Sequence, residues 1–341
     1  MMKLREIRQM LFDSKQLLQE ELVLSRHGHS FVLRSNNTSL LSELTSRLRN
    51  YIVDPDDKVD VGATIVVFEG EDVEMPFKWR QWPLVDGEGT GIRDLKKARA
   101  VRQASIGLTF LQSRKHRIAR GACAENLDRI EEFIHQQFAN ELLSEGGVLC
   151  HATCIRMGER AIAIAGPDRE RAEALANAVL VDPRAQLVTQ GDVIVSGKPG
   201  FRPLAYVLAP KADAPMEGAA AEVPSRKKGQ AKGKKKGAVV PSTKALALST
   251  LVLTNRLDAA DKEIDVRRIN PLSRPGLITG VMVGATPFSA KPEGGYFAPG
   301  EAPSVRAYVQ QLKNLDCYEA RIDLGAGNMG HAAPALLETA A

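Results

Sequence analysis

The sequence predicts an α/β protein with an N-terminal α+β region. In residues 144–325, short apolar segments typical of strands alternate with amphipathic helix patterns, as in an α/β sheet protein. In residues 1–143, alternating strand patterns cluster between a few helices, which indicates α+β organisation. The chain has 341 residues, of which 44% are hydrophobic, so it is long enough for about two domains and a sizeable core.

The N-terminal region contains a recognisable series of elements. An amphipathic pattern predicts a helix over residues 3–20, and apolar alternation predicts two strands around the turn His27–Gly28–His29. A second helix follows Thr38 or Ser39, either of which suits the N-cap. The remaining predictions are a strand at 63–70, a loop at 71–92, a hairpin at 97–121 that turns near residues 113–115, and a helix at 125–147 that stops at Gly146.

The second region begins with two strands joined by a turn at Gly158–Glu159, followed by a helix at 169–180. Apolar runs predict further strands, and the segments 263–282 and 304–325 are expected to supply more helix and a final strand. The predicted further strands cover residues 185–195, 204–210 and 246–257. Residues 326–341 form a small-residue C-terminal tail.

Residues 211–243 interrupt this pattern and predict a disordered basic insertion. They are rich in Ala, Pro and Gly, and residues 226–236 hold seven basic side chains and no acid. The whole chain carries a net charge of +5, so without this run it would carry 5 − 7 = −2. The run has no interleaved aromatic residues, so we expect a solvated linker and no nucleic-acid contact.

The cysteines and the N-terminus indicate an intracellular protein. Four cysteines without a paired short motif favour a reducing cytoplasm, and the charged N-terminus has no apolar core of a signal peptide. No apolar run is long enough to span a membrane, so no membrane partner is expected. Cys150 and Cys154 should face one side of a strand and His151 the other, so we expect no metal site.

The segment "AIAIAGPDRERAEALANAVL", residues 161–180, has the strand–glycine–helix order of a nucleotide-binding loop. A loop of the form G-x-x-x-x-G-K-[ST] needs two glycines, a lysine and a hydroxyl. With Gly166 as the first glycine, the second glycine position is Arg171, the lysine position is Ala172 and the hydroxyl position is Glu173. The pattern therefore predicts a structural turn, in which acids at the helix start meet the helix dipole themselves.

Several segments together resemble the HPr kinase/phosphorylase-like family, most of all its HprK-related kinase B branch. The resemblance covers most of residues 1–200 and 245–325. It rests on "SFVLRSNNTSLLSELTSRLRNYI", "NLDRIEEFIHQQFANELLSEGGVLCHAT", "RAIAIAG", "LALSTLVLTNR" and "INPLSRPGLITGVM". It implies a PEP-carboxykinase-like/HPr-kinase-like core in residues 144–325.

The resemblance also suggests residue roles. His151 matches a histidine close to the phosphate loop of that family, and Asp192 is the carboxylate nearest the position of its catalytic aspartate, displaced by about one residue. The degenerate loop positions are Gly166, Arg169, Arg171, Ala172 and Glu173. Because phosphoryl transfer depends on electrostatic stabilisation and metal positioning, these changes predict a pseudokinase.

Three hypotheses follow. The first is a pseudokinase that acts as a binding or regulatory subunit, with an unknown protein partner or as a homo-oligomer, and without a cofactor. The second is an active ATP-dependent protein serine kinase that uses Arg169, Arg171 or Lys198 with ATP and magnesium. The third is a tether for nucleic acid or acidic protein through residues 226–236.

Overall fold

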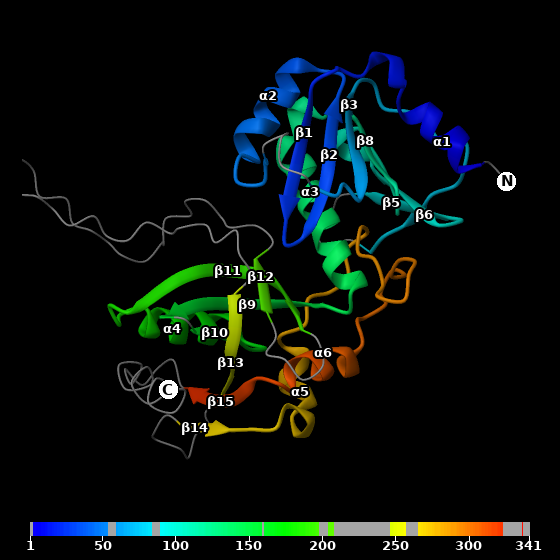
Figure 1. Ribbon diagram of the computed structural model, residues 1–341. Helices are drawn as coiled ribbons and strands as arrows, with labels where there is room; N and C mark the ends of the chain where they lie inside the picture. The colour runs from blue at the N-terminus through cyan, green and yellow to red at the C-terminus, as the bar shows by residue number, and fades with distance from the viewer. Residues whose placement is uncertain are drawn as a thin grey trace, which may run out of the picture.

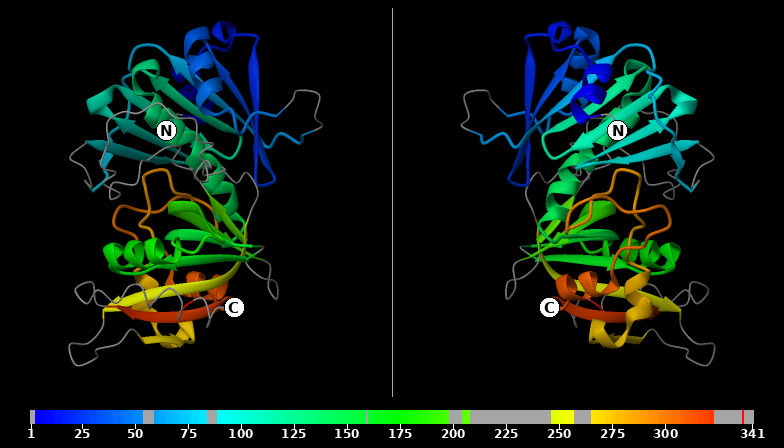
Figure 2. Two further views of the ribbon diagram at one scale, coloured as in Figure 1. Left: turned by 90° about the vertical axis from the view of Figure 1, so that its left-hand side faces the viewer. Right: turned by 90° about the vertical axis from the view of Figure 1, so that its right-hand side faces the viewer.

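The computed structural model describes residues 3–53, 59–83, 89–158, 160–197, 204–207, 246–256, 265–322 and Leu336. Within these ranges the protein is a mixed α/β structure with two mixed sheets, one of eight strands and one of seven. Figure 1 shows the first sheet and its helices at the top and the second sheet below, and the side views of Figure 2 agree. The general α/β prediction is therefore confirmed.

The first sheet has the strand order β1-β2-β3-β8-β7-β6-β5-β4. Strands β2, β3 and β8 run parallel, and the remaining neighbours are antiparallel. Its strands are β1 (Glu21–Arg26), β2 (His29–Ser35), β3 (Ala63–Glu69), β4 (Arg80–Gln81), β5 (Thr90–Leu95), β6 (Ala98–Gln103), β7 (Leu108–Ser113) and β8 (His116–Gly121).

Most elements predicted for this region are present, and four differ. Helix α1 (Leu4–Leu11) ends at Phe12, whose backbone is extended, so the predicted helix over 3–20 is too long. Asn37 caps α2 (Thr38–Arg47), and not Thr38 or Ser39, because its side chain accepts a hydrogen bond from the Leu40 amide. Two short strand segments, in β4 and at the start of β5, occupy part of the predicted loop 71–92. The predicted hairpin is three strands, because a further turn at Gly107 precedes β7.

Helix α3 (Leu127–Ser144) connects the two sheets. Its first turns carry Phe133 and Phe138 into the core of the first sheet, where Phe31 and Phe110 lie against them. Its last turns place Leu142 against the second sheet. The helix therefore contributes to the cores of both sheets, as its diagonal course in Figure 1 shows.

The second sheet has the strand order β10-β9-β11-β12-β13-β15-β14, and β10 also pairs with β13. Strands β10, β9, β11, β12 and β13 thereby form a closed ring of hydrogen-bonded neighbours. Strands β10, β13 and β15 run parallel. The strands are β9 (Val148–Met157), β10 (Arg160–Ala165), β11 (Ala185–Ser196), β12 (Leu204–Val207), β13 (Leu246–Arg256), β14 (Asp265–Arg268) and β15 (Asp316–Ile322).

Helices cover both faces of the second sheet. Helix α4 (Arg169–Val179) packs on Ile155, Ile162 and Ile164, which alternate with the residues of the opposite face. Helices α5 (Pro275–Thr279) and α6 (Val305–Leu312) pack on that opposite face. None of the helices in the described ranges is long and apolar enough to cross a membrane.

A C-terminal loop joins the two cores. Phe288 packs between Phe110 and Phe133, with ring centroids 5.1 and 5.5 Å away, and its carbonyl accepts hydrogen bonds from Gln112 and Asn140. The carbonyl of Pro287 likewise accepts a hydrogen bond from buried Arg99, which lies 188 positions earlier in the sequence. The division at residue 143 stays a prediction, and the predicted insertion at 211–243 lies outside the described residues. The tail, 326–341, is described only at buried, helical Leu336.

Candidate functional site

The candidate site lies on the face of the second sheet that carries α4. The end of α3 covers this face near Leu149 and Ile194, and α4 covers it near Ile155 and Ile162. Between the two helices, β9 and β11 present His151 and Asp192. The sheet is thus covered by apolar helix contacts on either side of a short polar stretch.

His151 and Asp192 are direct neighbours across the β9–β11 pair. His151 Nδ1 and Asp192 Oδ1 are 2.9 Å apart, and both side chains are partly exposed. A carboxylate on Nδ1 can hold an imidazole in one orientation and leave Nε2 available for proton transfer. The structure therefore brings together two residues that are 41 positions apart in the sequence.

The cysteines beside His151 have no part in this site. Cys150 and Cys154 are buried on the α5–α6 face, opposite His151, as the strand alternation predicts. Burial raises the pKa of Cys154 to about 12, so its thiol is unreactive near neutral pH. Among the described residues, no group of three or more His, Cys, Asp or Glu side chains is arranged to hold a metal ion.

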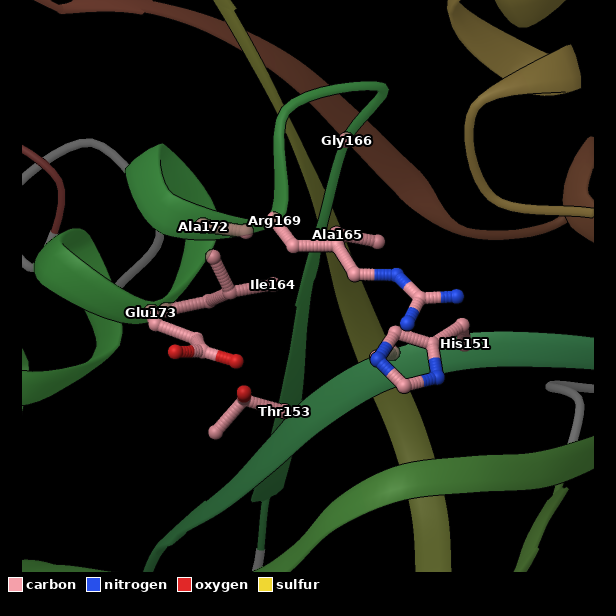
Figure 3. A pocket seen from close by; sticks show the side chains of 9 residues that line it. His151, Thr153, Ile164, Ala165, Gly166, Arg169, Ala172 and Glu173 are labelled. Carbon is pink, nitrogen blue, oxygen red and sulfur yellow. The ribbon is translucent and has the colours of Figure 1, made fainter. Parts of the chain in front are cut away.

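A small hollow connects His151 to the start of α4. It is lined by the following residues: His151, Ala152, Thr153, Ile164, Ala165, Gly166, Arg169, Ala172 and Glu173. Figure 3 shows the side chain of Arg169 reaching toward the ring of His151, while Glu173 and Thr153 point toward each other. Its accessible volume is about 10 Å³, the room that one water molecule needs.

The turn from β10 to α4 is closed against the rest of the domain. A Cβ added to Gly166 would lie 2.2 Å from Thr254 Oγ1 on β13. One residue later, Pro167 touches Gly280, where an added Cβ would lie 2.4 Å from the proline nitrogen. Glycine is therefore required at both places for close backbone packing.

Helix α4 begins early, at Arg169, three residues before Ala172. Asp168 is its N-cap and accepts a hydrogen bond from the Arg171 amide. The amides that would surround a phosphate are thus part of a helical turn whose end is capped by a carboxylate of the chain itself. The helix start at Arg169 and its Asp168 cap agree with the structural turn that the sequence predicts for this segment.

The degenerate loop positions have different surroundings. Ala172 is 6% exposed and packs in the core under α4, whereas Glu173 is exposed at the rim of the hollow. Arg171 is held by an ion pair with Asp168 and by a hydrogen bond from Nε to the Ile322 carbonyl at 3.2 Å. Arg169 is exposed, and no ion pair within the described ranges involves it. Lys198 lies outside the described residues.

Sequence reasoning placed His151, Asp192 and the five loop positions in one neighbourhood, but it missed Thr153 and Thr254. Thr153 lines the hollow from β9, two residues after His151. Thr254 carries no motif, so only the pairing of β10 with β13 reveals its contact with Gly166. In comparisons with known proteins, no family model matches the chain, and no curated protein shows a significant match.

Proposed function

We propose that this chain is an HPr-kinase-related pseudokinase, with a PEP-carboxykinase-like core, that acts as a binding or regulatory subunit. The observation that carries the proposal is the closed turn between β10 and α4. Gly166 is packed on Thr254, and α4 starts at Arg169 with Asp168 as its own cap, so groups of the chain itself take up the turn in which a phosphate would be held.

The residues at the key loop positions support the same proposal. A P-loop lysine neutralises phosphate oxygens and the following hydroxyl binds magnesium. Ala172 is buried among apolar side chains and supplies no charge, and Glu173 places a carboxylate where a nucleotide phosphate would approach. A carboxylate beside a polyphosphate repels it, so the hollow disfavours nucleotides electrostatically as well as sterically.

An active kinase that uses other basic residues is the alternative. Arg171 is a poor substitute for the lysine because Asp168 and the Ile322 carbonyl already hold its guanidinium. Arg169 is the better candidate, since it lies beside the His151–Asp192 pair, which keeps the geometry of a general base. This alternative needs the turn to open before ATP and magnesium can enter.

Titration calorimetry with Mg-ATP, combined with an ATP hydrolysis assay, separates the two proposals. A pseudokinase should show no binding heat up to millimolar nucleotide and no turnover. The outcome that contradicts the proposal is nucleotide binding together with hydrolysis or serine phosphorylation that is lost in Asp192→Ala and in Arg169→Gln. Arg184→Gln is a matched control, because Arg184 pairs locally with Asp182 and lies outside the hollow.

The binding role is tested separately from the lost chemistry. The polar stretch at His151, Arg169 and Glu173 is the exposed part of the former reaction face, so we expect a protein partner, or a second copy of this chain, to contact it. Light scattering measures the molar mass of the purified wild type and of the double variant Arg169→Glu/His151→Ala. The comparison shows whether a homo-oligomer depends on this face. A dimer that persists unchanged in the variant would exclude this face as its interface.

A further inference from the structure

A second group of charged side chains lies at the carboxyl ends of the parallel strands β13 and β15. Its centre is Glu319 on β15, whose side chain is fully buried. Pairing of β13, β14 and β15 places Asn255, Arg267 and Arg321 on the same face of the sheet as Glu319. Arg274, the residue before α5, approaches from above that face.

Three guanidinium groups share this one carboxylate. Arg267 makes the closest contacts, with Nε and Nη2 at 3.0 and 2.7 Å from Glu319 Oε2. Arg274 Nη2 is 3.6 Å from the same oxygen, and Arg321 Nε is 3.5 Å from Oε1. Asn255 donates to Oε1 at 2.8 Å. The carboxylate therefore orients three arginines that come from three different segments.

The charged groups of this cluster support one another. Asp265, at the start of β14, also acts on Arg267 and favours its charged form. Hydrogen bonds from Asn255 and Arg267 outweigh burial and lower the pKa of Glu319, so it stays ionised at neutral pH and holds the arginines in place.

Two of the arginines are partly exposed to solvent. The side chains of Arg267 and Arg274 are 39% and 42% exposed, although the carboxylate that they share is buried. A guanidinium has five N–H donors in a planar fork that suits the oxygens of a phosphate or a carboxylate. A carboxylate that fixes arginines from behind, with their outer edges open, is an arrangement pre-organised for an external oxyanion.

We propose that Arg267 and Arg274, oriented by Glu319, bind a doubly charged tetrahedral oxyanion of the phosphate class. In open α/β sheets, ligands bind outside the carboxyl ends of the parallel strands. Here the closed turn at Gly166 occupies that edge at β10, and the arginine group lies at the same edge two strands further on. The site is separate from the hollow at His151 and does not depend on the proposed loss of kinase activity.

Titration calorimetry with inorganic phosphate at pH 7.5, with ionic strength held constant by sodium chloride, tests the proposal. We expect a dissociation constant of about 1 mM or lower, since hydrogen bonds to charged groups are individually strong. Arg274→Gln should weaken binding about tenfold or more. It leaves the contacts of Glu319 with Arg267 and Asn255 intact, so the protein should stay folded, which a denaturation curve checks.

Arg268→Gln is the matched control. Arg268 is the next residue after Arg267, but it pairs with Asp316 and faces the other side of the strand. Its replacement should leave phosphate binding within a factor of two. Glycerol 3-phosphate is titrated in parallel. If it binds more tightly than inorganic phosphate, the ligand is an organic phosphate; otherwise the ligand is free phosphate. No binding at about 10 mM phosphate, tenfold above the expected dissociation constant, would overturn the proposal. Equal binding by wild type and Arg274→Gln would also overturn it.

Discussion

Gly166, at the end of β10, lies against Thr254 on β13 so closely that a Cβ on the glycine would be 2.2 Å from the threonine Oγ1 and 2.8 Å from its carbonyl oxygen. Thr254 Oγ1 donates to the Ala165 carbonyl at 3.3 Å, which ties the two parallel strands at this point. The glycine that looks like the first residue of a phosphate loop is therefore accounted for by strand packing. This contact closes the turn between β10 and α4, which is the observation on which the proposed function rests.

Replacing Gly166 with alanine should destabilise the protein. The added methyl group has to displace the backbone of β13 as well as a buried side chain, and such overpacking costs about 1–3 kcal/mol. Urea denaturation should show that loss in the free energy of unfolding. Gly276→Ala serves as the control, because its added Cβ meets nothing within 4 Å, and it should change stability by less than about 0.5 kcal/mol.

A double variant identifies the cause of that loss. Thr254→Ala removes Oγ1 but not the carbonyl, so Gly166→Ala/Thr254→Ala should recover part of the stability lost in Gly166→Ala. Equal losses in the presence and absence of the threonine hydroxyl would mean that the backbone contact alone decides the effect.

Introducing the lysine and hydroxyl of a phosphate loop should not create a nucleotide site. Ala172 is buried against apolar residues, so Ala172→Lys should lower the free energy of unfolding by about 1–3 kcal/mol, while exposed Glu173→Ser should be nearly neutral. The double variant should still show no heat with Mg-ATP, because α4 starts before residue 172. Nucleotide binding by the double variant would show that the turn opens readily. It would favour descent of this chain from an active kinase with an intact loop.

Stability should depend on pH through His135. Burial, with a further contribution from Arg26, lowers the pKa of this histidine to about 4 from its ordinary 6.5. The unfolded chain therefore binds a proton between pH 6.5 and 4 that the folded chain does not. Stability should be complete above pH 6.5 and fall as the pH drops toward 4, by up to about 3 kcal/mol.

Denaturation curves between pH 7 and 4.5 for the wild type and His135→Gln measure this contribution. The variant should lose less stability on acidification than the wild type, because it has no imidazole to charge at this position beside Tyr51. His29→Gln retains His135 and should keep the wild-type difference. Parallel curves for the wild type and His135→Gln would assign the acid sensitivity elsewhere.

Phe288 should be important for the stability of the first core. Its ring lies between Phe110 and Phe133 in the first core, although it belongs to the loop between α5 and α6, which pack on the second sheet. Phe288→Ala should cost about 3–5 kcal/mol, as for other buried phenylalanines. Limited proteolysis should then cut the loop around residues 284–301 faster than in the wild type. Phe297→Ala, in the same loop but only partly buried, should cost much less.

Local patterns determined much of this protein. Apolar alternation identified β3, β9 and β10, and the stripe of Ile130, Phe133 and Phe138 identified α3, because periodicity reports which side of an element is buried. The residues at the positions of a phosphate loop could also be read directly, since the sequence itself has Ala172 and Glu173 where such a loop has a lysine and a hydroxyl. The predicted end of α1 and the predicted cap of α2 were wrong, because neighbouring residues compete for the same hydrogen bonds at helix ends.

Only the tertiary structure decided which distant residues meet. The pairing of β9 with β11 places His151 beside Asp192, and the pairing of β10 with β13 closes the turn at Gly166 with Thr254. The arginines around Glu319 carry no motif, and they converge only because β14, β15 and the start of α5 lie side by side. Sequence patterns report the burial of each segment, whereas strand order and register depend on the packing of the whole chain, and it is that packing that assembles the sites.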